Sequence, residues 1–367
     1  MVFKPGPNPA IRVKKCLDTI RECAYSANKI PSMNEQNPEI APVEAIALPA
    51  YKDRATGLMV FGILTILLGC MAGLFVPLML ISQVVAAKSA GSAAPLSAMM
   101  PAILLYGMLA VALVWLGIGS IKARRWARAL LLIFSWSWLV MGVFAVIGAA
   151  FIMPKILAGA SGGPDTSHAM PASTIPVVMA VMFLMLGVFF ILVPAIWIFF
   201  YGSRHVKATC ETRDPVARWT DACPLPVLGF CLWLLFSAPM MLVMPLTGHA
   251  VMPFFGVFVT GLPGGLLCLA VAIIWCAAAW RLYRLDVRGW WLILIVFVAF
   301  MVSTVLTYAQ HDLIEMYQRM GYPQAQIEQM QKSGLLTGNR MNWLMVFSTL
   351  PLFGYMLFIK KYLRNKS

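Results

Sequence analysis

Charge is what this sequence has least of. Only 11% of its 367 residues are Asp, Glu, Lys or Arg, whereas a typical soluble domain has about 25%. Hydrophobic residues make up 61% of the chain. So few charges cannot provide a water-exposed surface for a chain of this length, which excludes a soluble globular domain, a disordered chain and a nucleic-acid-binding protein. The sequence therefore predicts a multi-pass α-helical membrane protein.

Ionisable groups are also missing from the middle of the long apolar stretches. Such groups are costly inside a membrane and usually functional there, so their absence argues against a carboxylate proton relay and against a bis-histidine haem. The chain has neither a His-Glu-x-x-His zinc pair nor a Gly-rich nucleotide loop ending in Lys-Ser/Thr. We therefore expect no enzyme activity, no catalytic residue and no cofactor.

What the chain does have is eight apolar stretches of the length that a spanning helix needs, about 20 residues. They are Leu58–Val85, Met99–Ile121, Trp126–Met153, Ile175–Tyr201, Pro224–Leu246, Phe254–Trp280, Gly289–Tyr308 and Asn342–Ile359. The fold class that they predict is an all-α integral membrane protein with eight transmembrane helices.

The basic residues predict the orientation of these helices. Cytoplasmic connections carry an excess of Lys and Arg. The two terminal segments and the connections after the second, fourth and sixth predicted helices hold 23 of the 28 Lys and Arg residues. We therefore expect both termini in the cytoplasm, and we read the net charge of +14 as a signal of topology.

The first four and the last four predicted helices resemble two copies of one unit. Both halves join their second and third helices by a short basic connection with Trp, 122–128 and 281–291. Four spans per unit is an even number, so the copies would form a parallel repeat. The alternative is that any two four-helix units with basic inner loops look alike. The expected parts are a segment 1–57, a first unit 58–204, a central loop 205–223, a second unit 224–362 and a tail 363–367.

The N-terminal segment 1–57 is polar enough to lie outside the membrane. Asn8 and Pro9 form a helix start, and apolar residues recur at helical spacing after them. We expect an interfacial helix over 9–28. The alternative is a mostly disordered arm, which the prolines of this segment favour.

The central loop carries the most distinctive residues. It reads His-Val-Lys-Ala-Thr-Cys-Glu from His205, Arg-Trp-Thr-Asp from Arg218 and Cys-Pro-Leu-Pro from Cys223. This order resembles a family of bacterial multi-pass membrane proteins of uncharacterised activity, over about 25 residues and the four-plus-four layout. The family pattern has a basic residue before the second Cys, where this chain has Ala222. The resemblance implies a bacterial inner membrane and supplies no catalytic role.

The thiols of this loop are of the kind that binds zinc. Cys210 and Cys223 with His205 have the right ligand atoms, and Cys16 and Cys23 on the same expected side could complete the set. The spacing between Cys210 and Cys223 is poor for a zinc knuckle, and a cytoplasmic disulfide is not expected. The alternative is ordinary thiols in an ordered linker between the repeats. In that case Trp219 anchors the loop at the membrane interface, while Arg213 and Arg218 form local pairs with Asp214 and Asp221.

Other candidate sites lie in and beside the spans. Pro239, Pro245 and Pro263 interrupt the fifth and sixth helices, as in transporter sites, although prolines are common in membrane helices. On the outer side we consider His168, His249 and His311 as copper or zinc ligands. The alternative is three unrelated histidines in loops. Residues 312–335 are expected to form a cap of two short amphipathic helices.

Together these patterns favour a non-enzymatic membrane scaffold or regulatory subunit in a bacterial inner membrane. The expected partners are the lipid bilayer and another membrane protein or a second copy of this chain. The alternative is a facilitator of an apolar or small neutral solute through the proline-broken helices. A metal site at the periplasmic edge is the third reading.

Overall fold

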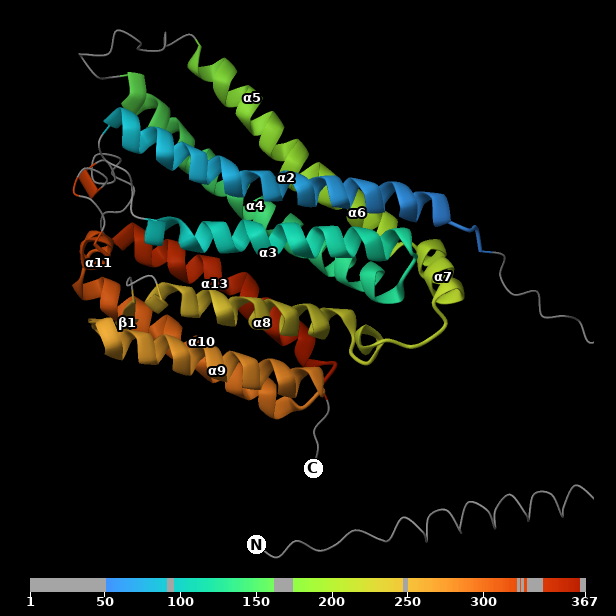
Figure 1. Cartoon of the computed structure of the whole chain (residues 1–367). Coiled ribbons are helices and arrows are strands. Elements are labelled where there is room, and N and C mark those ends of the chain that lie inside the picture. The colour runs from blue at the N-terminus through green and yellow to red at the C-terminus, as the bar shows by residue number, and fades with distance from the viewer. Residues whose placement is uncertain are drawn as a thin grey trace, which may run out of the picture. The chain divides into compact units, whose positions relative to one another are not determined.

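The protein is built almost entirely from helices, most of them long and lying side by side (Figure 1). In this computed structural model the described residues are 51–90, 96–161, 174–246, 250–321, 324, 327–328 and 339–363. Those from Tyr51 onward belong to one unit. The expected interfacial helix 9–28 lies outside the described residues.

Among the described residues the first half contains four helical spans, and the second half contains three together with a β-hairpin. The first half consists of α2 (Ala55–Ala90), α3 (Leu96–Ile121), α4 (Arg125–Ser161), α5 (Ile175–Gly187), the π-helix η1 (Val188–Leu192) and α6 (Val193–Gly202). The connection contains α7 (Arg204–Arg213) and the 3₁₀ helix η2 (Trp219–Asp221). The second half consists of α8 (Leu225–Leu246), β1 (Val251–Phe254), β2 (Val257–Thr260), α9 (Gly261–Tyr283), α10 (Val287–Gln310), α11 (Leu313–Arg319) and α13 (Asn339–Lys360).

Seven of the described helices are long and apolar enough to cross a membrane, which agrees with a multi-pass α-helical membrane protein. The predicted number was eight. The last predicted span falls in α13, where the apolar helix found within the described residues, Thr349–Lys360, is shorter than a span. The described residues therefore account for seven predicted spans and leave the eighth open.

The sixth predicted span was wrong at its start. The structure begins α9 at Gly261, and the preceding residues form an antiparallel hairpin of β1 and β2. Its two-residue loop, Phe255 and Gly256, has positive φ at both positions (42° and 95°), as a type I′ turn requires. Alternating Val and Phe residues favour strands, so an apolar run that suits a membrane helix by composition folds here as a hairpin.

Each half has its own apolar core. Leu58, Leu131 and Tyr201 are fully buried in the first cluster, to which α7 contributes Val206 and Cys210. The second cluster contains fully buried residues of α8, α9, α10 and α13, namely Leu228, Leu234, Leu282, Trp290, Ile293, Met356 and Ile359. The indole Nε1 of Trp290 donates to the carbonyl oxygen of Met356 at 2.8 Å, which ties α10 to α13. The chain thus folds as two adjoining helical cores.

Glycines let the first two helices approach each other closely. A Cβ atom on Gly62 would lie 2.9 Å from the carbonyl oxygen of Gly117, and one on Gly69 would lie 3.1 Å from that of Ala110. Small residues at such contacts drive helix packing in membranes. Gly69 and Gly73, which are four residues apart on α2 as in a small-xxx-small motif, therefore pack within the chain, against α3.

The fourth span is interrupted by a π-helical turn. The N–H of Val193 donates to the carbonyl of Val188, a bond five residues long, just before Pro194. The segment before this turn, α5, has no buried residue and diverges from α2 (Figure 1). At the middle of the π-helix, Phe190 approaches α4 at Gly142, where a Cβ atom would overlap the carbonyl oxygen of Phe190. The contact between α4 and η1 therefore depends on a glycine.

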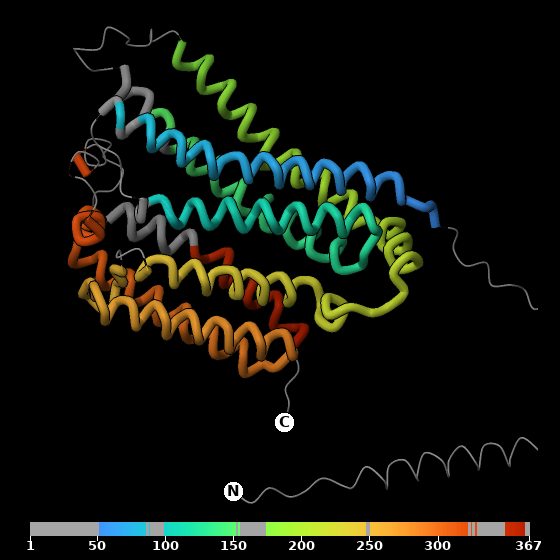
Figure 2. The backbone as a smooth tube through the Cα atoms, viewed as in Figure 1, coloured from blue at the N-terminus to red at the C-terminus, as the bar shows by residue number. Residues whose placement is uncertain are grey.

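The two short turns that follow α3 and α9 lie at the same end of the molecule (Figure 2). Both turns contain a non-glycine residue with positive φ, Ala123 at 50° and Leu285 at 59°. This end also holds the start of α2, all of α7 and the end of α13, and most of the described Lys and Arg residues are found there. We call it the basic end.

We predict that Gly142→Ala destabilises the fold, because the methyl group would push η1 away from α4. The expected loss is about 1–3 kcal/mol, the usual range for overpacking. Thermal unfolding in detergent measures it.

Gly148→Ala is the matched control, since it lies on the same helix and a Cβ atom there meets nothing within 4 Å. Since Ala is the better helix former, we expect no loss of stability there and a gain of at most about 1 kcal/mol. Equal effects of the two substitutions would contradict the assigned contact.

Candidate functional site

The connection between the two halves is folded onto the basic end. Ser203 begins α7 as its N-cap, with its side chain accepting from the N–H of His205 at 3.3 Å. One face of α7 is apolar and buried in the first core through Val206, Thr209 and Cys210. The helix ends at Asp214, whose N–H donates to the carbonyl of Cys210 at 2.9 Å. Amphipathic spacing thus fixes α7 against the first half.

Asp214 is a buried carboxylate surrounded by arginines. Its side chain is only 2% exposed. Arg218 donates to both carboxylate oxygens, from Nη2 at 3.0 Å and from Nε at 3.4 Å. Arg124 places Nη1 at 3.5 Å from Oδ1, and the backbone N–H of Arg125 donates to Oδ2 at 3.4 Å. The carboxylate therefore joins the end of α7 to the turn between α3 and α4.

These contacts keep Asp214 ionised. The hydrogen bonds from Arg218 lower the pKa of Asp214 against the opposing effect of burial, and Arg124 and Arg125 add to the shift. A buried charge without such partners would be strongly unfavourable. A lowered pKa means that the ionised carboxylate stabilises the fold above the ordinary Asp pKa of about 3.9, and that this stability is lost as pH falls through the lowered value.

A second shell of ion pairs surrounds this centre. Arg125 reaches Glu211 on α7 at 3.3 Å and Asp221 in η2 at 3.8 Å. Asp221 also accepts the N–H of Arg218 at 2.9 Å. One arginine at the start of α4 therefore contacts both ordered pieces of the connection.

The chain that leads into α2 is tied to α7 as well. Arg213 pairs with Asp53 at 3.1 Å, and the N–H of Arg54 donates to Oγ1 of Thr209 at 3.1 Å. On the other side, the hydroxyl of Tyr283 at the end of α9 donates to the carbonyl oxygen of Trp219 at 2.9 Å. The connection thus contacts both halves. We call it the central clamp, residues 203–223.

The structure does not bring the predicted zinc ligands of this loop together. Cys210 belongs to the first core and Cys223 to the second. His205 uses Nδ1 to accept the N–H of Lys52 at 3.3 Å. Burial raises the pKa of each thiol to about 11, which leaves both in the protonated form at neutral pH. Within the described residues no three His, Cys, Asp or Glu side chains are grouped as metal ligands would be. Cys16 and Cys23 lie outside those residues.

Trp219, Arg218 and Asp221 take different places in the central clamp. Arg218 and Asp221 form local pairs, as the linker hypothesis predicts. The expectation of a local pair was wrong for Arg213, which reaches back to Asp53 in the segment before α2. The ring of Trp219 is 46% exposed, so it lies at the surface and the large cost of removing a core aromatic does not apply to it.

The three prolines do not line one cavity. A groove of about 520 Å³ between α8 and α9 is lined by Pro245 with Gly261, Gly265 and leucines. Pro239 and Pro263 do not line this groove, and both are exposed. It is an open surface groove on two helices and gives no support to a pathway bounded by the three prolines.

At the opposite end His311 holds the hairpin in place, and the other two candidate histidines, His168 and His249, lie outside the described residues. Nε2 of His311 is 3.2 Å from the carbonyl oxygen of Gly256, and Nδ1 is 2.7 Å from Oε2 of Glu315. Arg319 donates from Nη2 to Oε1 of Glu315 at 2.6 Å and from Nη1 to the carbonyl of Phe258 at 3.3 Å. This chain of contacts, the outer latch, fastens α11 to the hairpin.

His311 and Arg319 converge on the carboxylate of Glu315. A carboxylate accepts hydrogen bonds, and the imidazole and the guanidinium are the donors that face it. Their hydrogen bonds, first from Arg319 and then from His311, lower the pKa of Glu315. The spacing of four between His311, Glu315 and Arg319 was a visible helical signal that the sequence analysis did not use.

Part of the predicted cap is present. Within the expected range 312–335 the structure describes α11 and a few residues beyond it, while 329–335 lie outside the described residues.

No protein-family model, curated protein sequence or solved structure matches this chain.

We predict that Glu315→Gln opens the outer latch, because the neutral amide loses the ionic contacts to His311 and Arg319. Hydrogen exchange of the hairpin 251–260 should accelerate by about tenfold, as expected for losing a hydrogen bond to a charged group. Lowering the pH of the wild-type protein through the lowered pKa of Glu315 should do the same.

Asp312→Asn is the control, since this neighbouring carboxylate is exposed and its side chain makes no capping hydrogen bond. Unchanged hairpin exchange in Glu315→Gln, or an equal change in Asp312→Asn, would rule out the latch.

Proposed function

We propose that the protein is a non-enzymatic membrane scaffold or regulatory subunit, and that the central clamp is the surface that binds its partner. The proposal rests on a row of exposed apolar residues, which we call the rim, beside the network of ion pairs around Asp214, which we call the base. Pro215, Val216 and Ala217 are exposed beside Trp219, in a segment that is not part of a span. Val216 is 61% exposed.

The base beneath this rim is held in one conformation before any partner arrives. Asp214 precedes the rim and Arg218 lies within it, and these two residues form the bidentate ion pair of the clamp. A surface that is already ordered loses little conformational entropy on binding. Tryptophan and arginine are also the residues that most often dominate binding energy.

The side chains of the central clamp that could react are engaged in packing or in ion pairs, which suits a structural role for the clamp. The thiols of the clamp are protonated, and its carboxylates and arginines pair with one another. The protein partner would be another membrane protein or a second copy of this chain.

Eight crossings with both termini in the cytoplasm are part of this proposal. α13 has 22 residues, the length of a span, and it ends at the basic end, where α2 begins. The excess of Lys and Arg at that end supports the cytoplasmic side. The bacterial inner membrane is proposed on the resemblance of the central loop alone.

A parallel repeat of two four-helix units is supported by the two turns at the basic end. After α3, the N–H of Ala123 donates to Ser120 and that of Arg124 to Gly119. After α9, Leu285 donates to Leu282 and Asp286 to Arg281, with the same spacing. In both turns the residue with positive φ is not glycine, although glycine is the usual choice in this motif. Two turns that share this uncommon feature at equivalent places favour the duplication of one unit over the alternative that any two four-helix units with basic inner loops look alike.

Photo-crosslinking in native membranes tests the docking surface. A photoreactive residue in place of Val216 should give a protein adduct of one defined mass. Asp214→Asn in the same protein should weaken that adduct, because it loosens the base without altering the rim.

The control places the photoreactive residue at Ile295, which is 63% exposed on the apolar surface of α10. There we expect lipid adducts. Lipid adducts alone at both positions would show that the rim lies in the membrane interface, and would refute the proposed docking surface.

A further inference from the structure

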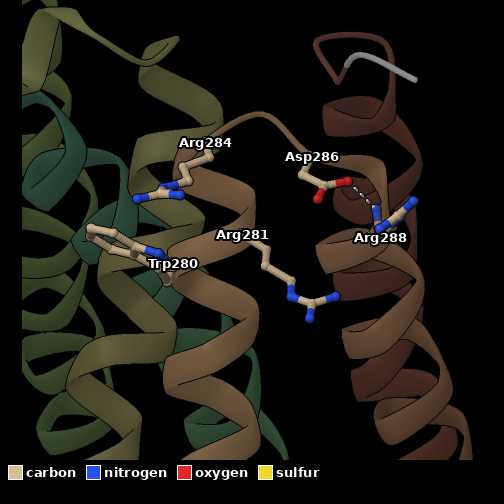
Figure 3. A pocket seen from close by; sticks show the side chains of 5 residues that line it. All are labelled: Trp280, Arg281, Arg284, Asp286 and Arg288. Atoms are coloured by element: carbon tan, nitrogen blue, oxygen red, sulfur yellow. Dashed lines mark hydrogen bonds between the residues drawn. The ribbon is translucent and has the colours of Figure 1, made fainter. Parts of the chain in front are cut away.

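A second feature of the basic end is a cavity lined by arginines. It has a volume of about 310 Å³ and lies where α9 ends and α10 begins (Figure 3). Its lining residues are Trp280, Arg281, Arg284, Asp286 and Arg288. In Figure 3 the side chain of Arg281 points into the space between the two helices, and that of Arg284 lies beside Trp280.

The positive charge of this arginine pocket is not neutralised by the protein. Asp286 is its one carboxylate, and Oδ1 accepts the backbone N–H of Arg288 at 2.9 Å as the N-cap of α10. In the described part of the chain no ion pair joins Arg281, Arg284 or Arg288 to a carboxylate. Three guanidinium groups and one carboxylate leave an excess of two positive charges.

The pocket is held in shape by its own turn. The guanidinium carbon of Arg284 lies 4.6 Å from the centroid of the Trp280 ring, a cation–π contact. Leu285 has φ 59°, and the N–H of Asp286 donates to the carbonyl of Arg281 at 3.0 Å. The turn that closes the two helices thus also fixes the positions from which the side chains extend.

The position of the pocket along the helices points to its ligand. α9 and α10 are both candidate spans, and the pocket lies at their adjoining ends. Trp280 is 57% exposed and Trp291 is 49% exposed on the same two helix ends. Exposed tryptophans at span ends mark the level of the lipid headgroups. A phosphate group of the bilayer is therefore at the same depth as the arginines.

We propose that the arginine pocket binds the phosphate of an anionic phospholipid headgroup. Guanidinium groups match phosphate oxygens in bidentate geometry, better than the point charge of lysine does. The volume equals that of about ten waters at roughly 30 Å³ each, which suits a whole headgroup better than a bare ion. The lipid site is independent of the docking surface, since Val216 and the other rim residues do not line it.

Binding to the wild-type protein in detergent tests the site, with bound lipid counted by native mass spectrometry. Phosphatidylglycerol should bind as one tight adduct and displace phosphatidylcholine, which has no net charge. Inorganic phosphate alone should not displace the phosphatidylglycerol. Equal binding of both lipids, or displacement by inorganic phosphate at comparable concentration, would overturn the proposal.

A pair of double variants then locates the adduct. Arg281→Gln with Arg288→Gln should weaken phosphatidylglycerol binding at least about tenfold, because each lost contact to a charged group is worth roughly one such factor. Lys122→Gln with Arg204→Gln removes two exposed charges from the same end outside the pocket, and should keep the wild-type affinity. Equal losses in both double variants would show general attraction to the basic end and contradict a defined site.

Discussion

Asp214 is the group on which the arrangement of the basic end depends. Its carboxylate is buried at the end of α7 and accepts from the side chain of Arg218 and the backbone of Arg125. Burial of an ionised carboxylate is tolerated only when its charge and its acceptor positions are satisfied. The positions of the two segments that carry these donors therefore depend on each other. The turn after α3, the end of α7 and the loop to η2 are held together because one charge needs all of them.

This coupling gives a physical reason for the order of the central clamp. The clamp lies between two apolar cores that each belong to one half of the chain, and it contacts Asp53 on one side and Tyr283 on the other. A flexible linker would leave the halves to pack through their helices alone. An ordered one carries a fixed surface, which is what the docking proposal requires.

Much of the fold could be predicted from composition and periodicity, because a membrane span is set by length and apolarity. The boundaries of α8 and α10 follow the apolar runs closely. The hairpin before α9 could not be predicted in this way, because Val and Phe residues are as typical of an apolar membrane helix as they are of a β-strand. The sequence also did not predict that Cys210 and Cys223 lie in two different cores, because the spacing along a loop does not determine which core a thiol enters.

Local pairs were easier to foresee than distant ones. Arg218 and Asp214 carry opposite charges in the same short loop, so a local contact between them could be expected. The partner of Arg213 is Asp53, 160 positions away, and only the folded chain brings them together. The arginine pocket had a weak signal, three arginines in one short connection, which was read for orientation alone.

Hydrogen exchange of residues 203–223 in Asp214→Asn tests most directly whether one buried carboxylate orders the clamp. At neutral pH we expect exchange there to rise by roughly tenfold or more, the effect of losing hydrogen bonds between charged groups. Exchange in α8 to α10 should stay at the wild-type level. Asp53→Asn, which removes an exposed partner of the same clamp, should have a smaller effect. Wild-type exchange across the clamp in Asp214→Asn would contradict the account.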